Sequence, residues 1–340
     1  MPSLSNPQPE KTDSESFAIN EVALGFVRAT EQGAIAAASW RGKGAERAAD
    51  MAAMDALHHS LNNIGVNATI VIGEEGEKLY VGEAVGAGNG PRLDIAVDPL
   101  EGTTLCAKNL NDALVALAVA EPGNLLHVPN IYMHKIAIGP GYPDGLVDLD
   151  ASPSDNVAAL AQAKKVPVSE ISVCVLDRPR HGALIEQLRS IGASVRLIGD
   201  GDIAGVIHAA NVFESGIDIY LGSGGAPEGV LAAAAIRCLG GFMQARLILD
   251  RPDQVQLALK AGITEHDKKY QVDDLAAGNV LFAATGVTSG ALVDGVRIGK
   301  HHVHTASIVM NSLYSNVRWI STRHSRQSLV FVPGGSQEAR

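Results

Sequence analysis

The sequence predicts an α/β fold with two subdomains, and three observations support this prediction. The chain has 340 residues, which is longer than a single hydrophobic core ordinarily supports. Between residues 171 and 239, strand-like apolar runs alternate with helical segments, the pattern of a sheet covered by helices. A stretch rich in Pro and Gly at 139–154 predicts a boundary. We therefore expect a disordered tail at 1–15 and two subdomains, at 16–152 and at 153–335.

Two helices are predicted to open the first subdomain. Apolar residues recur at helical spacing from Phe17 to about Trp40, and an alanine-rich segment follows to about Asn62. Apolar runs then predict strands at 68–72, 78–81, 92–97, 113–119 and 132–138. In the second subdomain the expected alternation is strand 171–176, helix 182–191, strand 194–198, helix 203–210, strand 217–221 and helix 229–239. Strands at 242–249, 280–284, 291–298 and 307–310 are expected to complete the second subdomain.

The composition excludes several classes of partner. The formal net charge is -10, whereas a nucleic-acid surface needs clustered Lys and Arg. No segment approaches a membrane-spanning run of apolar residues, and the polar N-terminus lacks the apolar core of a signal peptide. Three scattered cysteines form neither a disulfide framework nor a zinc ligand set. We expect a cytoplasmic protein that binds a small molecule.

The most informative feature is the segment from Asp98 to Thr103. It follows the apolar run at 93–97, and Pro99 is expected to end that strand. The loop then carries two carboxylates, Asp98 and Glu101, and the hydroxyl of Thr103 after Gly102. Clustered oxygen ligands suit Mg²⁺ or Mn²⁺, and a glycine at a helix start lets the backbone approach a phosphate. A polar turn without a ligand is the alternative.

Two more carboxylates precede this loop in the chain. Glu74 begins a run of acidic residues directly after an apolar strand, and such close like charges repel unless cations or solvent separate them. Asp50 lies within an alanine-rich helix, where a charge without a partner is costly. A solvated acidic turn at Glu74 and a water-facing Asp50 are the alternatives.

Polar residues also follow two strands of the second half. Asp200, Gly201 and Asp202 come after the strand at 194–198, where one aspartate could be only a helix N-cap. The glycine-rich segment 222–229 contains Glu228 near a helix start, either as a helix-end carboxylate or as a metal ligand. Neither nucleotide-binding fingerprint is satisfied here. Arg178 and Arg180 could be structural partners of Asp177 or Asp200.

Together the carboxylates at 50, 74, 98, 101 and 228 provide what a multi-metal phosphatase needs. In such an enzyme one ion activates a water molecule and another stabilises the leaving oxygen. No Asp or Cys lies in a recognisable nucleophile motif, so water is expected to attack the phosphate directly.

The chain resembles a class II fructose-1,6-bisphosphatase of the lithium-sensitive sugar-phosphatase superfamily. The resemblance runs from about Phe17 to Met310. It is based on the segments 70–74, 94–103, 132–135, 178–181, 200–202, 224–229 and 284–288.

The resemblance implies a layered αβαβα fold and two or more divalent ions, Mg²⁺ or Mn²⁺. Asp50 and Glu74 would bind one ion, and Asp98, Glu101 and Glu228 another. The subdomain at 16–152 would then be the metal-binding phosphatase subdomain, and the α/β subdomain at 153–335 would contribute substrate loops and Glu228. Thr103, with Asp50 and Glu74, would serve catalysis by helping to activate water. The implied contacts to the sugar bisphosphate are Glu101, Gly102, Thr103, Tyr132, Arg178, Pro179, Arg180, Asp200, Gly201, Asp202 and Gly225. The assembly implied is a homodimer or homotetramer.

The expected reaction is removal of the 1-phosphate of fructose 1,6-bisphosphate. The alternatives are a sedoheptulose 1,7-bisphosphatase, an enzyme that acts on both sugars, and a non-catalytic sugar-phosphate sensor. Two departures from the family pattern adjoin the expected metal site. Residues 44–47 read Gly-Ala-Glu-Arg in place of a Gly-Asp-Lys-Asn-like stretch, and the acidic hairpin after Glu74 is shortened to residues 75–80.

Overall fold

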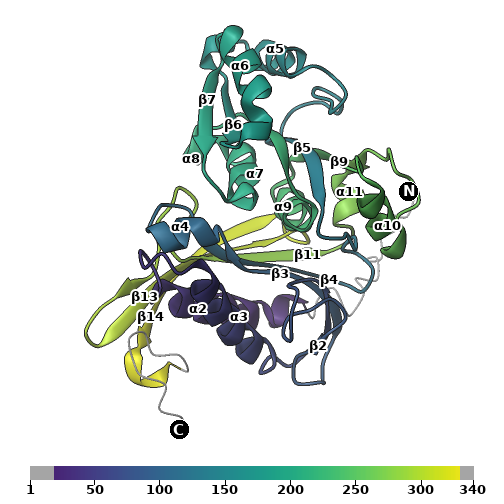
Figure 1. Cartoon of the computed structure of the whole chain (residues 1–340). Helices are drawn as coiled ribbons and strands as arrows, with labels where there is room; N and C mark the ends of the chain where they lie inside the picture. The colour runs from purple at the N-terminus through teal and green to yellow at the C-terminus, as the bar shows by residue number, and fades with distance from the viewer. Residues whose placement is uncertain (1–18, 330–340) are drawn as a thin grey trace, which may run out of the picture.

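The computed structural model describes residues 19–329, and the expected tail at 1–15 lies outside them. Two β-sheets alternate with three layers of helices (Figure 1). This arrangement confirms the layered α/β fold class, in the order helices, sheet, helices, sheet, helices. The described helices are α2 (Ala23–Ala38), α3 (Glu46–Leu61), α4 (Thr103–Lys108), α5 (Pro153–Lys164), α6 (Gly182–Ser190), α7 (Asp202–Ala210), α8 (Val212–Ser215), α9 (Ala226–Leu239), α10 (Pro252–Lys260) and α11 (Val272–Leu275). Three 3₁₀ turns lie at Val168–Glu170, Pro179–His181 and Arg326–Ser328.

The first sheet has eight strands in the order β12-β13-β11-β4-β3-β1-β2, with β14 paired to the other side of β13. Its pairs are antiparallel except for β1 with β3. Helices α2 and α3 pack on one face of this sheet, where their alanine-rich surfaces join the core. The strands are β1 (Asn67–Ile72), β2 (Ala84–Val85), β3 (Arg92–Glu101), β4 (Leu114–Ala120), β11 (Val280–Gly286), β12 (Arg297–Ile298), β13 (His302–Asn311) and β14 (Asn316–Ser325).

The second sheet has six strands in the order β10-β9-β5-β8-β6-β7. Strand β6 is parallel to both β7 and β8, and the other pairs are antiparallel. Helices α5 and α6 close its outer face over an apolar core. The strands are β5 (Tyr132–Ile138), β6 (Ser172–Leu176), β7 (Ser194–Ile198), β8 (Ile219–Gly225), β9 (Phe242–Leu247) and β10 (Tyr270–Gln271).

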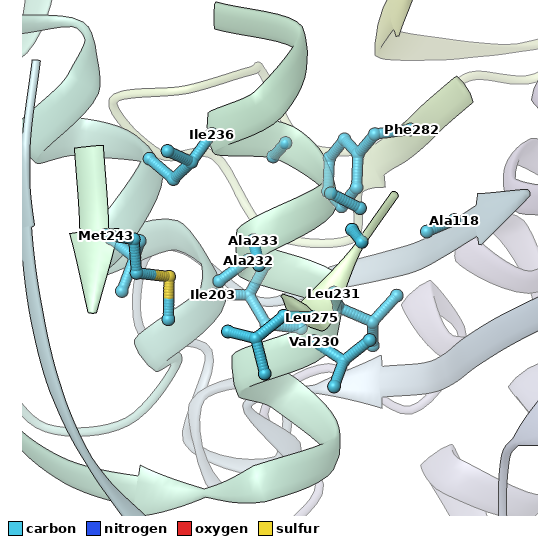
Figure 2. Close-up of a cluster of buried hydrophobic side chains, with 14 of the residues drawn as sticks. Ala118, Ile203, Val230, Leu231, Ala232, Ala233, Ile236, Met243, Leu275 and Phe282 are labelled. Atoms are coloured by element: carbon cyan, nitrogen blue, oxygen red, sulfur yellow. The ribbon is translucent and has the colours of Figure 1, made fainter. Parts of the chain in front are cut away.

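Helices α7 and α9 form the middle layer between the two sheets. The segment 232–235 of α9 consists of four alanines, all fully buried, and these small side chains leave room for both sheets to approach the helix. Figure 2 shows α9 between Phe282 of the first sheet and Met243 of the second. The N-termini of α7 and α9 are thereby held at the level where the candidate site residues converge.

Several expectations from the sequence differ from the structure. Strand β3 does not end at Pro99 but continues to Glu101, with a register shift between Asp98 and Glu101. Proline is tolerated there because an irregular pair does not require its missing N–H. Residues 78–81 form no strand, since Leu79 adopts φ +55 and turns the chain. Of the expected strand at 291–298, only β12 is present.

The expectation that the last strands complete the second subdomain is wrong for the strands after residue 279. Strands β11 to β14 all belong to the first sheet, where β11 lies between β4 and β13. Apolar periodicity identifies a strand but not its partner. The paired strands β11 and β4 are more than 150 residues apart in the sequence. The boundaries of the two subdomains themselves stay a prediction.

Candidate active site

The end of β3 places two carboxylates together. The irregular pairing between Asp98 and Glu101 bends the strand, and the Leu100 amide donates a hydrogen bond to Asp98 Oδ1 at 3.0 Å. Gly102 then adopts φ +78, a left-handed conformation that favours glycine. Helix α4 begins at once with the half-buried Thr103. Bulges of this kind commonly redirect side chains beside active sites.

Glu228 joins these two carboxylates from another part of the chain. It lies in the first turn of α9, and oxygen atoms of Asp98, Glu101 and Glu228 all lie within 4.8 Å of one another. Glu228 Oε2 is buried and has no hydrogen-bond partner among residues 19–329. A buried carboxylate oxygen without a partner is costly. Together with oxygens of Asp98 and Glu101 it completes a three-carboxylate donor set of the kind Mg²⁺ and Mn²⁺ prefer. The site therefore fits a divalent cation.

Asp50 on α3 and Glu74 after β1 stand beside this cluster. Burial raises the pKa of Glu74 to about 7, with further contributions from the charges of Asp50 and Glu228. Burial, followed by the charges of Glu228 and Glu74, raises the pKa of Asp98 well above its ordinary value. The pKa of Asp50 is also raised by burial. Both side chains are partly buried, so neither is fully solvated, and their role as metal ligands stays a prediction.

A cavity of about 380 Å³ opens beside the cluster, and Glu74, Asp98 and Glu228 line it. A larger hollow of about 560 Å³ lies near Arg237 and contains none of the residues expected from the sequence. We assign the site to the smaller cavity, since the buried carboxylates converge there.

The segment 200–202 approaches the cluster from the start of α7. Gly201 has φ +81 and precedes the helix, and the Ile203 amide donates to Glu101 Oε1 at 2.9 Å. Asp202 is the first residue of α7 and forms an ion pair with Lys135. Neither aspartate caps the helix through its side chain, so the N-cap alternative is wrong.

Arg180 and Tyr132 form a rim on the same side. The Arg180 guanidinium lies 4.6 Å from the centroid of the Tyr132 ring and donates to the Ser223 carbonyl at 2.7 Å and to Ser223 Oγ at 3.1 Å. Tyr132 pairs in register with Gly225, and Glu228 follows three residues later. A Cβ atom at Gly225 would overlap the Glu228 carboxylate, so a larger residue here would displace that carboxylate.

Arg178 has partners of its own beside this rim. It pairs with Asp200 at 3.0 Å and donates to the Gly199 carbonyl, which agrees with the structural alternative for this arginine. Pro179 is exposed and begins the 3₁₀ turn at 179–181. The structure thus brings all the expected residues to one region, whereas their binding of metal and substrate stays a prediction.

Two residues with structural importance, His181 and Lys135, were not predicted. His181 is buried, with Nδ1 2.8 Å from the Leu176 carbonyl, and its Nε2 accepts a hydrogen bond from the Ser223 amide at 2.9 Å. Burial lowers the pKa of His181, consistent with a neutral ring that holds Ser223 under Arg180. Lys135 is fully buried. A lysine inside an otherwise apolar strand was the available signal for it.

The fold and this cluster together define a class: a layered α/β metal-dependent phosphatase. The comparisons with known proteins identify its family. Residues 20–324 match the family described as "Bacterial fructose-1,6-bisphosphatase, glpX-encoded", and the chain belongs to this family. The family and enzyme class expected from the sequence are confirmed.

Curated relatives cover nearly the whole chain. A "D-fructose 1,6-bisphosphatase class 2/sedoheptulose 1,7-bisphosphatase" of Synechococcus sp. (strain JA-3-3Ab) is 42% identical over 90% of this chain and 96% of its own length. A protein with the same name from Prochlorococcus marinus (strain MIT 9515) is 39% identical over 88% of this chain and 95% of its own length.

One solved structure is much more distant. It is an extragenic suppressor from Pyrococcus furiosus, with 15% sequence identity and a TM-score of 0.29 over 56% of this chain and 69% of that chain. This likeness is too weak to bear on fold or function. Among the described residues, no helix is long and apolar enough to cross a membrane.

Proposed function

We propose that the site removes the 1-phosphate of fructose 1,6-bisphosphate with Mg²⁺ or Mn²⁺ bound at the carboxylates. The observation that carries this proposal is the convergence of Asp98, Glu101 and the unpartnered Glu228 oxygen within 4.8 Å. Asp98, Glu101 and Glu228 would hold one ion, and Asp50 and Glu74 a second. Bound ions would supply an activated water and stabilise the leaving oxygen.

The residues around the cluster have separable roles in this proposal. Thr103, two residues after Glu101 at the start of α4, orients the attacking water. The backbone at Gly102 and Gly201 lies at two helix starts. The partial positive charge at the N-terminus of α7 favours anionic groups beside the cluster. The hydrogen bond from the Ile203 amide to the Glu101 carboxylate is one such interaction.

Arg180 binds the phosphate that is not transferred. Its planar guanidinium suits a phosphate, and its stacking on Tyr132 holds it at the exposed rim. Asp200 and Asp202 accept hydrogen bonds from sugar hydroxyls. Arg178 orders Asp200 through their ion pair, so its contribution to substrate binding is indirect.

A second substrate is also proposed. The relatives above are named for both fructose 1,6-bisphosphate and sedoheptulose 1,7-bisphosphate. Tyr132 at the rim is exposed, which would leave room for the longer sugar. We propose that this chain hydrolyses both. Assembly as a homodimer or homotetramer is supported by exposed Trp319 and Tyr314, and light scattering measures it. A cytoplasmic location is supported by the three buried, unpaired cysteines.

Phosphate release tests this proposal directly. The protein is incubated with Mn²⁺ and either bisphosphate, and with fructose 6-phosphate as the matched monophosphate. We expect turnover of both bisphosphates and little of the monophosphate. Binding of the bisphosphates without phosphate release would contradict the proposal and favour the sensor alternative.

A further inference from the structure

Lys135 is a charged residue in the interior of the second sheet. It lies on β5, between β8 and β9, and its side chain is 0% exposed. An ammonium group is strongly hydrated in water, and its burial is costly unless it is paired and hydrogen-bonded. Its position therefore requires a compensating interaction.

The Lys135 ammonium connects the two loops that reach the carboxylate cluster. It forms an ion pair with Asp202 at the start of α7, whose side chain is 6% exposed. It also donates to the Gly225 carbonyl at 2.9 Å, directly before α9 and Glu228. Gly224 leaves the space for this contact, because a Cβ there would overlap the Asp202 carboxylate and lie 3.2 Å from Lys135 Nζ.

This ammonium faces an excess of negative charge. The charge of Asp202 acts on Glu101 and on Glu228, where it adds to burial in raising the pKa of each carboxyl. The charge of Lys135 acts on Glu228 in the opposite direction. Lys135 is thus a fixed cation at the edge of a cluster that otherwise consists of carboxylates.

We infer that Lys135 occupies, with its ammonium group, the place beside Asp202 that a further divalent cation would otherwise take. Asp202 is then held free of metal for the substrate, and ions are confined to Asp98, Glu101, Glu228, Asp50 and Glu74. Lys135 is thus a positioning residue, and this inference rests on the proposed function for both the metal ions and the substrate.

Mn²⁺ binding to the metal-free protein tests this inference without turnover. Lys135→Met leaves the Asp202 charge unpaired, so we expect one additional Mn²⁺ per chain or binding tighter by about tenfold. Asp202→Asn leaves the ammonium unpaired, so Mn²⁺ should bind about tenfold more weakly. Electron paramagnetic resonance of free Mn²⁺ measures both quantities. Unchanged number and affinity in Lys135→Met would overturn the inference.

The chain offers a matched control in a second lysine–aspartate pair. Lys164 of α5 pairs with Asp218, which precedes the opposite end of β8 from Gly225. Lys164→Met loses a similar ion pair away from the cluster and should bind Mn²⁺ as the wild type does. A change equal to that of Lys135→Met would assign the effect to general loosening of the fold and contradict the inference.

The double variant Lys135→Met/Asp202→Asn keeps the test decisive if Lys135→Met does not fold. It removes both charges, so Mn²⁺ binding should return to the wild-type number and affinity. If it instead binds Mn²⁺ as weakly as Asp202→Asn, Asp202 contributes to the metal site directly and the inference fails. Phosphate release is measured separately. Absence of turnover in the wild type, with the expected Mn²⁺ shifts, would reject the proposed substrate and retain the role of Lys135.

Discussion

Replacing Glu74 with glutamine should stabilise the metal-free protein at alkaline pH. The folded Glu74 carboxyl has a pKa of about 7, against 4.5 as its ordinary value. The unfolded chain therefore loses this proton first, and the folded state loses stability as the pH rises through that window. Discounted for partial exposure, the shift corresponds to about 2–3 kcal/mol of destabilisation near pH 8. Glu74→Gln removes the charge and this cost.

Thermal unfolding measures the effect. For a chain of this size, 2–3 kcal/mol corresponds to a rise in Tm of roughly 3–4 °C near pH 8. Near pH 5 the folded carboxyl is protonated, and the difference should fall below about 1 kcal/mol. With saturating Mn²⁺ the wild type should have the higher Tm, because the ion stabilises it more than the Glu74→Gln variant, which has one ligand fewer.

A matched control lies in the same loop. Glu77 is exposed, and Glu77→Gln removes the same charge without relieving the buried cluster. Its Tm should stay close to that of the wild type under each condition. A metal-free Glu74→Gln protein that is no more stable than the wild type near pH 8 would refute the reasoning. So would an advantage that is independent of pH.

Two further variants separate chemistry from binding. Thr103→Ala should lower kcat by roughly 100-fold or more if Thr103 orients the attacking water, and Thr103→Ser should retain more activity. Equal kcat values for the wild type and Thr103→Ala in steady-state kinetics would remove Thr103 from the mechanism. Arg180→Ala should raise KM for fructose 1,6-bisphosphate about tenfold or more, for a loss of about 1.5–3 kcal/mol, with a smaller effect on kcat. An unchanged KM with a lower Tm would assign Arg180 to its contacts with Ser223 and Tyr132.

The alternation of apolar strand runs with helical segments predicted the α/β class, and the resemblance to a known family supplied the layered αβαβα order. The strand at 132–138 and the helices α6 and α7 lie within a residue or two of their expected positions. Helices α5 and α10 and strand β14 were not predicted. The apolar periodicity of α5 is weak, and β14 carries several exposed polar residues. Helix α10 is amphipathic and was predictable from its apolar spacing.

The carboxylates of the site were predicted, but their geometry depends on tertiary structure. Glu228 comes from α9, 127 positions after Glu101, and only packing of α9 between the sheets brings their oxygens within 4.8 Å. The position of Lys135 shows the same limit. Its ammonium meets Asp202 because α7 begins beside β5, and no local pattern encodes that pairing.

The central claim is that the carboxylate cluster hydrolyses fructose 1,6-bisphosphate through bound divalent ions. Phosphate release by EDTA-dialysed protein, before and after Mn²⁺ is added back, tests it most directly. We predict no release from the metal-free protein and restored release as Mn²⁺ saturates the site. Undiminished release from the metal-free protein would contradict the claim.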